Sequence, residues 1–421
     1  MDITKTKNPR EAAYLALLSS AREESFLIDS LAQWQAKCRP SIQDYHLARE
    51  VAYGTTRMAL ALDHLALQLA DKKKLALKLR EKILFRMGLY QFHYMDKIPL
   101  YAIVDETIKI AKIHCHESFV KFLNACLRKV EEIDPQLPKG ETVPELSIRY
   151  SYPAYYVQEL VQNFGLEKAE EIMEAGNRPS QTMFRVRPQA SRPKEANGEI
   201  DFLAGTRCGM GVIRDPSLIS NISSSSDYYI QNATPAELMS SLAQDFGAPK
   251  NILDLCSSPG GKLILAHDLY PDAELSANDV SSGKLKPLSE NCAKYGISTT
   301  LSSVRGEEFP LAQKFDLVIL DVPCSNTGVL NKRPEARWRL SQKTLEQLEE
   351  IQLQLLRRGI ELLDKGGELW YLTCSVLKRE NGRLIDKVCQ ELSLETRLKE
   401  AILPNADGWD GGFGCALRKI G

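Results

Sequence analysis

Apolar residues recur at helical spacing through residues 9–133. The segments "IQDYHLAREVAYGTTRMALALDHLALQL" and "KLREKILFRMGLYQFHYM" each keep an apolar side over several turns, and "SFVKFLNACLRKVEEI" continues the pattern. Proline and glycine are almost absent inside these segments, but residues 134–145 carry three prolines and a glycine. The pattern predicts an all-α domain over residues 1–140, followed by a linker or domain edge.

A region of mixed character follows over residues 141–230. Residues 151–188 indicate two helices and a strand, whereas residues 189–230 alternate short strands with turns. The stretch "NISSSSDYY" predicts a polar loop. We therefore expect a small α/β region that connects two larger domains.

Strands and helices alternate from about residue 235 to the end. Apolar runs such as "NILDLC", "AELSAN", "FDLVILD", "ELWYLT" and "GFGCALRKI" are separated by amphipathic segments such as "TLEQLEEIQLQLLRRGIELL". This alternation is typical of a doubly wound sheet with mostly parallel strands. The pattern predicts an α/β doubly wound domain over residues 231–421.

Composition is that of an ordinary globular protein. The chain has 421 residues, of which 43% are hydrophobic and 26% charged. No apolar run reaches the roughly 18 residues of a membrane span, and the start "MDITKTKNPREAAYLALL" has no signal pattern. Ten cysteines are scattered without a C-x-x-C pair, which argues against a zinc ribbon. We expect a cytoplasmic protein that binds neither membrane nor metal.

The charge is divided unevenly along the chain. Residues 1–130 hold 21 Lys and Arg against 14 Asp and Glu, a difference of +7, while the whole chain has a net charge of −1. A basic first third indicates either an anionic partner at that end or an ordinary solvated helical surface.

A glycine-containing turn follows the first strand of the α/β domain. In "LDLCSSPGGK" (253–262), the strand ends near Asp254 and the turn opens a helix. Ligands of doubly wound folds sit at the carboxyl ends of strands, and Asp279 ends the next strand, where a carboxylate accepts from ribose hydroxyls. The turn is not G-x-G-x-x-G, so it indicates a single nucleoside-like cofactor; alternatively, Asp279 is a charge near a helix N-terminus.

Two strands of this domain end close to a cysteine. Asp321 and Cys324 follow one strand, and Cys374 follows another, 50 residues later. In the predicted topology both strand ends open onto the same edge of the sheet. A polar, partly exposed setting can lower a thiol pKa, so the pair indicates reactive thiols. Buried structural cysteines or a disulfide remain the alternatives.

The motifs "LDLCSSPGGK", "DVPCSNTGVLNKRPEARW" and "YLTCSVLKREN" resemble signature motifs of the S-adenosylmethionine-dependent RNA cytosine-5 methyltransferases. The final "DGWDGGFGCALRKI" is similar to the closing strand of that family. The segments "REKILFRMGLYQFHYMDKIPLYAIVDETIKIAK" and "FVKFLNACLRKV" resemble a NusB-like domain. A NusB-like domain before a Rossmann-like methyltransferase domain is the layout of the bacterial RsmB (Sun/Fmu) enzymes, which modify small-subunit ribosomal RNA.

This resemblance implies a role for each motif residue. It makes Cys374 the nucleophile that adds to carbon 6 of cytosine and Cys324 the residue that assists release of the methylated base. Asp321 would hold N3 and the exocyclic amine, and Lys262 would favour the thiolate. Asp279 would bind the ribose of S-adenosylmethionine. The rest of the cofactor would lie along Cys256, Ser257, Ser258, Pro259, Gly260, Gly261 and Lys262, with Asp321 beside it.

The chain departs from the family pattern at one position. Arg305, Gly306 and Glu307 stand where the family usually has an aspartate that contacts the adenine side, so that contact is left unassigned. The expected partner is small-subunit ribosomal RNA, bound by a monomer.

The sequence also offers candidate RNA contacts, which are Arg178, Arg185, Arg187, Lys332, Arg333, Arg337 and Trp338. Trp338 either stacks on a base or anchors the core. Three other functions stay open: the same reaction on transfer RNA, a non-catalytic RNA-binding scaffold, and a thiol redox enzyme.

Overall fold

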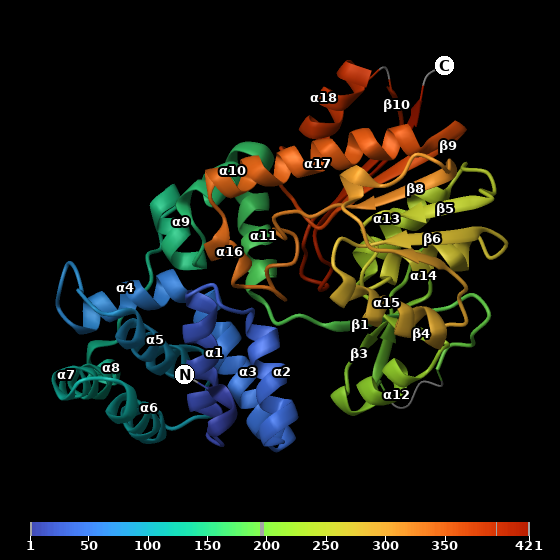
Figure 1. Cartoon of the computed structure of the whole chain (residues 1–421). Coiled ribbons are helices and arrows are strands. Elements are labelled where there is room, and N and C mark those ends of the chain that lie inside the picture. Colours follow the sequence, from blue (N-terminus) through green and yellow to red (C-terminus); the bar gives the residue numbers. More distant parts are fainter. Residues whose placement is uncertain (1, 194–197, 393, 420–421) are drawn as a thin grey trace. The chain divides into compact units, whose positions relative to one another are not determined.

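The chain begins as a series of helices and ends as a layered sheet (Figure 1). The computed structural model describes residues 2–193, 198–392 and 394–419. Close contacts divide the chain into two units, Met1–Ala169 and Glu170–Gly421, and the division falls inside α11. The helices of the first part are α1 (Pro9–Ala21), α2 (Leu27–Cys38), α3 (Ile42–Arg57), α4 (Ala59–Leu69), α5 (Leu79–Tyr94), α6 (Leu100–His114), α7 (Glu117–Arg128), α8 (Val130–Ile133), α9 (Val143–Tyr150), α10 (Ala154–Phe164) and α11 (Leu166–Asn177), after a 3-10 turn η1 (Ile3–Lys5).

One apolar core holds the first eight helices together. Their inward sides supply fully buried side chains such as Trp34, Leu62, Leu84 and Leu123. Local signals set the helix ends; for example, the Asn8 side chain accepts from two backbone N–H groups in the first turn of α1. The predicted all-helical first part is confirmed.

A small antiparallel sheet follows in the second unit. Its strands are β1 (Thr182–Val186), β2 (Ile200–Phe202), β3 (Met210–Ile213) and β4 (Tyr228–Ile230), in the order β2-β3-β1-β4. The 3-10 turn η2 (Pro216–Leu218) and the helix α12 (Ile219–Ser224) lie between β3 and β4. The expected polar loop in "NISSSSDYY" is therefore wrong in part. Ile222 is buried against Phe184, Ile200 and Ile213, and this apolar anchor favours a helical turn there.

The larger sheet has seven strands in the order β10-β11-β9-β8-β5-β6-β7. β5 to β9 pair in parallel, and β11 runs antiparallel to both β9 and β10. β10 was not expected from the sequence. The strands are β5 (Asn251–Asp254), β6 (Glu274–Asn278), β7 (Thr300–Ser302), β8 (Phe315–Asp321), β9 (Leu363–Thr373), β10 (Leu394–Ile402) and β11 (Gly412–Lys419).

Helices cover both faces of this sheet (Figure 1). Alternate strand residues divide between two cores: Leu317 packs toward α14 and α15, whereas its neighbour Val318 packs toward α17 and α18. The helices of this unit are α13 (Ala233–Ala243), α14 (Gly261–Leu269), α15 (Ser282–Lys294), α16 (Ala336–Arg339), α17 (Gln342–Leu362) and α18 (Gly382–Leu392), with a 3-10 turn η3 (Gly306–Glu308).

The strand order reverses between β5 and β8, which lie side by side. Such a switch point is where doubly wound sheets bind their ligands. The predicted fold class, a helical part followed by a doubly wound α/β part with a small α/β region between them, is confirmed. The boundaries at residues 140 and 230 stay a prediction. Among the described residues, no helix is both long and apolar enough to cross a membrane.

Candidate active site

The two cysteines that follow β8 and β9 lie together at the carboxyl edge of the sheet. β8 and β9 are parallel neighbours, with Asp321 opposite Leu372. Cys374 follows β9 directly, and Cys324 lies three residues beyond the end of β8. Their Sγ atoms are 3.0 Å apart, both side chains are half-buried, and both thiols are free. The sulfurs therefore form one partly exposed pair.

The two loops that carry the thiols are tied to each other. Asn326, in the left-handed region at φ 59°, donates from Nδ2 to the Cys324 carbonyl at 3.0 Å and accepts from Cys374 Sγ at 3.4 Å. The Gly328 N–H donates to the Cys374 carbonyl at 2.8 Å. The Gly411 N–H in turn donates to the Gly328 carbonyl at 2.7 Å. A movement of either loop would therefore change the geometry of the sulfur pair.

A lysine–aspartate pair lies beside the thiols. Lys262, in the first turn of α14, places Nζ 2.6 Å from Oδ2 of Asp321 at the end of β8. Burial disfavours the charged amine, but Asp321 and the nearby Cys374 outweigh this effect and raise the pKa of Lys262. The site thus keeps a positive charge close to Cys374, where it stabilises a thiolate.

The turn between β5 and α14 is shaped for close approach of a ligand. Gly260 has φ +102°, and a Cβ there would lie 2.7 Å from Leu288 Cδ1. Asp279 follows β6 and is 6% exposed; it accepts from the N–H groups of Ser258 at 3.3 Å and Ser281 at 3.1 Å. Asp279 is therefore held against the turn, as expected for a ribose acceptor.

Asp254, at the end of β5, is a site residue that the sequence reading did not assign. It is completely buried, and neither carboxylate oxygen has a well-formed hydrogen bond among the described residues. Burial, reinforced by the charge of Asp321, raises the pKa of Asp254 to about 7. An acidic residue inside "NILDLC" was a signal that could have identified it. Ser257 and the Cys256 backbone offset only part of the cost of burying this acid, so it is suited to a cationic ligand group.

Two exposed apolar side chains stand at the ends of β6 and β7. Val280 is 64% exposed and Val304 is 36% exposed. The Asn278 side chain joins these strand ends, because it donates to the Val304 carbonyl at 3.0 Å and accepts from the Val304 N–H at 3.1 Å. An aromatic ring placed here would meet apolar surface on two sides.

The unassigned stretch after β7 is occupied by an internal ion pair. Arg305 and Glu307 are hydrogen-bonded to each other, and Glu307 lies in η3. Burial acts to raise the pKa of Glu307, but a backbone hydrogen bond and Arg305 lower it. Glu307 therefore already has a partner inside the protein.

Cys256, in the cofactor turn, differs from the thiol pair. Burial, reinforced by the charge of Asp254, raises the pKa of Cys256 well above its usual range. It therefore behaves as a packing residue and not as a reactive thiol.

Three of the predicted RNA-contacting arginines form contacts inside the protein, and their role in RNA binding stays a prediction. Arg185 is 1% exposed and lies 2.5 Å from Asp268 in an ion pair. Arg187 also pairs with Asp268, at 2.8 Å, and lies over the ring of Tyr295. Arg337 is fully buried and donates to Asn177 Oδ1 at 2.9 Å. Arg185 and Arg337 are buried against internal acceptors, whereas Arg187 is half-buried.

The remaining RNA candidates lie nearer the surface. Lys332 pairs with Asp410 at 2.6 Å but is one-third exposed, and Arg333 is exposed in the same turn. Arg178 is exposed beside Glu174, and Trp338 is half-buried. These four side chains stay predicted RNA contacts.

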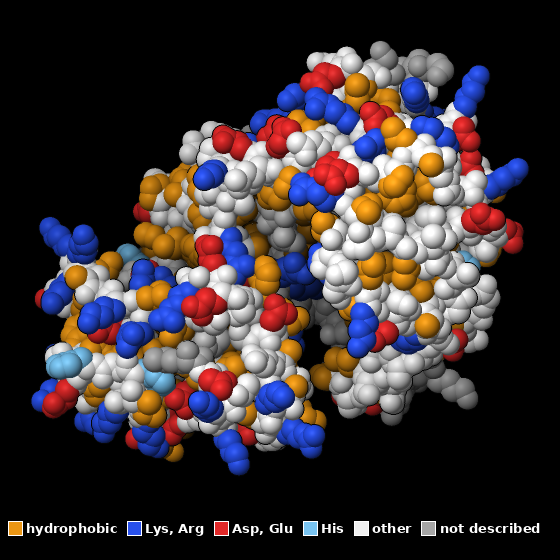
Figure 2. Space-filling model, in the orientation of Figure 1, with side chains coloured by type: hydrophobic (Ala, Val, Ile, Leu, Met, Phe, Trp, Pro, Cys, Tyr) orange, Lys and Arg blue, Asp and Glu red, His pale blue; other side chains and the backbone are white. Residues whose placement is uncertain are grey.

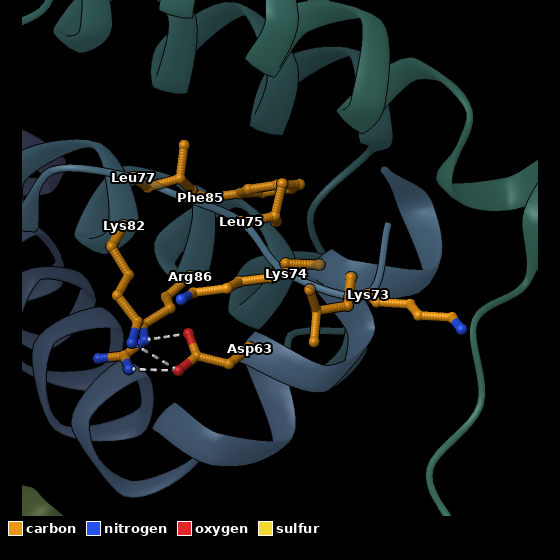
Figure 3. Close-up of a pocket in the computed structure, with 10 residues that line it drawn as sticks. Asp63, Lys73, Lys74, Leu75, Leu77, Lys82, Phe85 and Arg86 are labelled. Carbon is orange, nitrogen blue, oxygen red and sulfur yellow. Dashed lines mark hydrogen bonds and ion pairs between the residues drawn. The ribbon is translucent and has the colours of Figure 1, made fainter. Parts of the chain in front are cut away.

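The helical unit has a cavity of its own, of about 220 Å³ (Figure 3). Leu75, Leu77 and Phe85 form an apolar part of its lining, and Lys73 and Lys74 are exposed beside it. Lys82 and Arg86 also line this cavity, and both form ion pairs with Asp63. Lys and Arg side chains are spread over the visible face of this unit (Figure 2).

Comparison with known proteins gives a consistent result for both parts of the chain. Residues 244–418 match the family described as 16S rRNA methyltransferase RsmB/F, and residues 7–132 match the NusB family. The chain is 28% identical to the probable ribosomal RNA small subunit methyltransferase B of Bacillus subtilis (strain 168), covering 99% of this chain and 100% of that protein. It is 27% identical to ribosomal RNA small subunit methyltransferase B of Escherichia coli (strain SMS-3-5 / SECEC), covering 99% of each.

Two solved structures share the fold. PH0851 superposes with a TM-score of 0.77 at 20% identity, over 98% of this chain and 99% of that one. A methyltransferase homolog protein from Pyrococcus horikoshii superposes with a TM-score of 0.57 at 22% identity, over 67% of this chain and 100% of that one.

Proposed function

Because residues 244–418 match the RsmB/F family of 16S rRNA methyltransferases and residues 7–132 match the NusB family, we propose that this chain methylates carbon 5 of a cytosine in small-subunit ribosomal RNA. Relatives named ribosomal RNA small subunit methyltransferase B align over 99% of the chain, which supports the substrate class. The observation that carries the cytosine-5 chemistry is the pair of free thiols 3.0 Å apart beside the Lys262–Asp321 ion pair.

The residues around the β5–α14 turn fit S-adenosylmethionine. The close backbone at Gly260 admits the cofactor, and the ribose hydroxyls would donate to Asp279. Val280 and Val304 would flank the adenine, and the buried Asp254 would accept from the ammonium group. When bound, the cofactor supplies an electrophilic methyl group on a sulfonium.

Cys374 is the proposed nucleophile. Carbon 5 of cytosine is too weak a nucleophile to attack the methyl group by itself. Addition of the Cys374 thiolate to carbon 6 forms an S–C bond and moves the electron pair of the 5,6 double bond onto carbon 5. Lys262 favours the thiolate, since its positive charge lies close to this sulfur.

Asp321 would bind the edge of the base. Its carboxylate is held at the end of β8 by Lys262 at 2.6 Å and keeps 34% of its side chain exposed. From there the carboxylate can accept from the exocyclic amine, and from N3–H when N3 takes up a proton. Protonation of N3 draws electron density from carbon 6 and assists addition.

Cys324 would act after methyl transfer. The proton at carbon 5 must then leave, so that its electron pair re-forms the double bond and expels the Cys374 thiolate. Cys324 assists this release of the enzyme from the methylated base, and its sulfur is within 3.0 Å of the leaving sulfur. The order of the two steps gives the two cysteines different mutant phenotypes.

RNA would be bound by both units. In the second unit the exposed Arg333, with Lys332 and Trp338, follows β8 in the chain and is suited to phosphates and bases. In the helical unit the cavity beside Lys73 and Lys74 combines positive charge with an apolar lining (Figure 3). That combination suits a nucleotide of single-stranded RNA.

A denaturing gel tests the chemistry directly. Each variant is mixed with substrate RNA and S-adenosylmethionine, and the RNA-bound protein is resolved as a slow band. Cys374→Ala should give neither product nor adduct, whereas Cys324→Ala should methylate once and accumulate the covalent complex. A slow band from Cys374→Ala, or none from Cys324→Ala, would reverse or remove these roles. A redox enzyme would instead lose activity equally in both variants.

Bisulfite sequencing of RNA from a deletion strain tests the substrate. The proposal expects one 16S rRNA cytosine to lose protection while transfer RNA is unchanged. Loss of protection in transfer RNA instead would favour the alternative substrate, and no change in either RNA would favour a non-catalytic scaffold.

A further inference from the structure

Glu380 is a buried acid for which the reaction described above has no use. It lies in the turn before α18 and is 0% exposed. Burial of a carboxylate is unfavourable unless its oxygens accept hydrogen bonds or meet a cation. Within the described part of the chain, the hydrogen bonds that its carboxylate accepts come from neutral groups.

Four donors converge on the two carboxylate oxygens. Oε1 accepts from the Ser325 N–H at 2.8 Å and from Nε2 of Gln352 at 3.1 Å. Oε2 accepts from the hydroxyl of Ser375 at 2.6 Å and from the hydroxyl of Ser325. An ionised carboxylate can accept all four bonds, so this geometry matches its full capacity.

These donors belong to the two thiol-bearing loops. Ser325 directly follows Cys324 in the chain, and Ser375 directly follows Cys374. The two hydroxyl oxygens are also 3.1 Å from each other. Both residues are buried: Ser325 is 4% exposed and Ser375 is 0% exposed. One carboxylate therefore holds the residue next to each sulfur.

Further contacts make this tie rigid. Gln352, on α17, donates to the Pro323 carbonyl at 2.9 Å as well as to Glu380. The Tyr371 hydroxyl, on β9, donates to the backbone carbonyl of Glu380 at 2.7 Å. Gln352 thus fixes the carboxylate of Glu380, and Tyr371 fixes its backbone.

We propose that Glu380 is a positioning residue for the methyl transfer: its carboxylate ties Ser325 to Ser375 and so sets the distance and direction of the Cys324 and Cys374 sulfurs. This inference rests on the proposed function. A thiolate must lie about 3–3.5 Å from the carbon that it attacks, so a tie behind the sulfurs controls the rate of addition.

The charge of Glu380 also acts on Cys324. The hydrogen bond to Cys374, then burial, then the charges of Cys374 and Glu380 raise the pKa of Cys324 well above its usual range. Cys324 therefore keeps its proton and can donate a hydrogen bond to the Cys374 sulfur. The two thiols thus differ in protonation although they are chemically alike.

Two variants weaken the tie in different ways. Glu380→Gln keeps the size and most of the hydrogen-bonding positions but removes the charge, and the serine hydroxyls can rotate to accept. Ser375→Ala keeps the Glu380 charge but removes the hydrogen bond that joins the Cys374 loop to the Glu380 carboxylate. Glu368→Gln is the matched control, because Glu368 is equally buried, lies on β9 and pairs with Arg397 and Arg418 at 2.6 Å.

The first measurement uses the protein without RNA or cofactor. Diamide oxidises two neighbouring thiols to a disulfide: the thiols give up two protons and two electrons, and the N=N bond of diamide is reduced to a hydrazine. The Cys324–Cys374 peptide pair is quantified over time by mass spectrometry. We expect Ser375→Ala, which keeps the Glu380 charge, to form it at least tenfold more slowly than the wild type, and Glu368→Gln to match the wild type. Loss of the Glu380 charge lowers the Cys324 pKa and favours oxidation, so Glu380→Gln should be slowed less than Ser375→Ala.

The second measurement follows single-turnover adduct formation with substrate RNA and S-adenosylmethionine, with every variant placed in a Cys324→Ala background where the adduct accumulates. Both tie variants should slow it at least tenfold while RNA affinity stays within twofold of wild type. Wild-type rates of both reactions in Glu380→Gln and Ser375→Ala would overturn the proposal, as would an equal slowing in Glu368→Gln. If the tie variants slow disulfide formation but Cys324→Ala forms no adduct with any cytosine RNA, the positioning stands and the proposed function fails.

Discussion

Gly328→Ala should disturb the active site more than its size suggests. A Cβ at this position would lie 2.2 Å from the Gly411 carbonyl oxygen and 2.8 Å from the Cys374 carbonyl oxygen. Both neighbours are backbone atoms, so neither can rotate away, and about 1 Å of extra separation must open. Either the loop of Gly328, which carries Cys324, or the loop of Cys374 must then move.

The magnitude follows from that displacement. Overpacking of this kind costs about 1–3 kcal/mol of folding free energy. Misplacement of a reacting group by ~1 Å can slow a reaction by ~10²-fold. We therefore expect Gly328→Ala to remain folded at 25 °C with a lower melting temperature and to form the covalent RNA adduct about 100-fold more slowly.

The assay is single-turnover adduct formation on a denaturing gel in a Cys324→Ala background, where the adduct accumulates, together with thermal unfolding of the same preparation. Gly382→Ala is the control, since a Cβ there meets no atom within 4 Å and the glycine does not have a positive φ. Wild-type adduct rates in Gly328→Ala would refute the claim that these loop contacts set the thiol geometry. So would a loss of the same size in Gly382→Ala.

Three further predictions concern the cofactor, the pH dependence and the RNA. Asp279→Ala should weaken S-adenosylmethionine binding without unfolding the chain, and calorimetry showing unchanged affinity would remove the ribose assignment. Because Asp254 has a folded pKa of about 7, raised from 3.8, the native state binds the extra proton and wild-type stability should fall as pH rises between about 4 and 7. Asp254→Asn should remove this slope and be more stable near pH 8 by up to about 4 kcal/mol, measured by urea unfolding; parallel pH curves would contradict the assignment. Lys73→Glu with Lys74→Glu should weaken RNA binding and reduce its salt dependence by roughly one unit of slope per lost phosphate contact. Reversal at Lys121, which is exposed and paired with Glu117, should have a smaller effect, and equal losses would argue against a specific site.

The fold was largely predictable because its periodicities are strong and local. Alternation of apolar runs with amphipathic segments specified the parallel strands, and the helical part had clear apolar sides. β10 escaped prediction because "LETRLKEAI" is largely polar and is a strand through its pairing with β11. A local pattern does not record a pairing partner that lies farther along the chain.

The site was predictable where the chemistry is carried by residue type, and less so where it depends on burial. The cysteines and Asp321 follow apolar runs, so the topology alone brings them to one edge of the sheet. Arg185 and Arg337 are arginines like any others in the sequence, and only the fold shows that each is buried against an internal acceptor. Glu380 is the converse case, because a glutamate in "LKREN" gives no local sign that four donors surround it.

The position of the thiol pair explains why this chemistry uses two adjacent strands. Neighbouring parallel strands lie about 4.8 Å apart, so side chains just beyond their ends can come into contact without any unusual backbone. Asp321 and Cys324 lie at and beyond the end of β8, and Cys374 lies just beyond β9. β5 lies on the other side of β8, and the turn that follows it leads into α14, which carries Lys262. A base that enters at this edge would meet the proposed nucleophile, the proposed release group and the proposed cofactor turn from three successive strands. The strand order, more than any single loop, therefore makes a two-cysteine mechanism possible here.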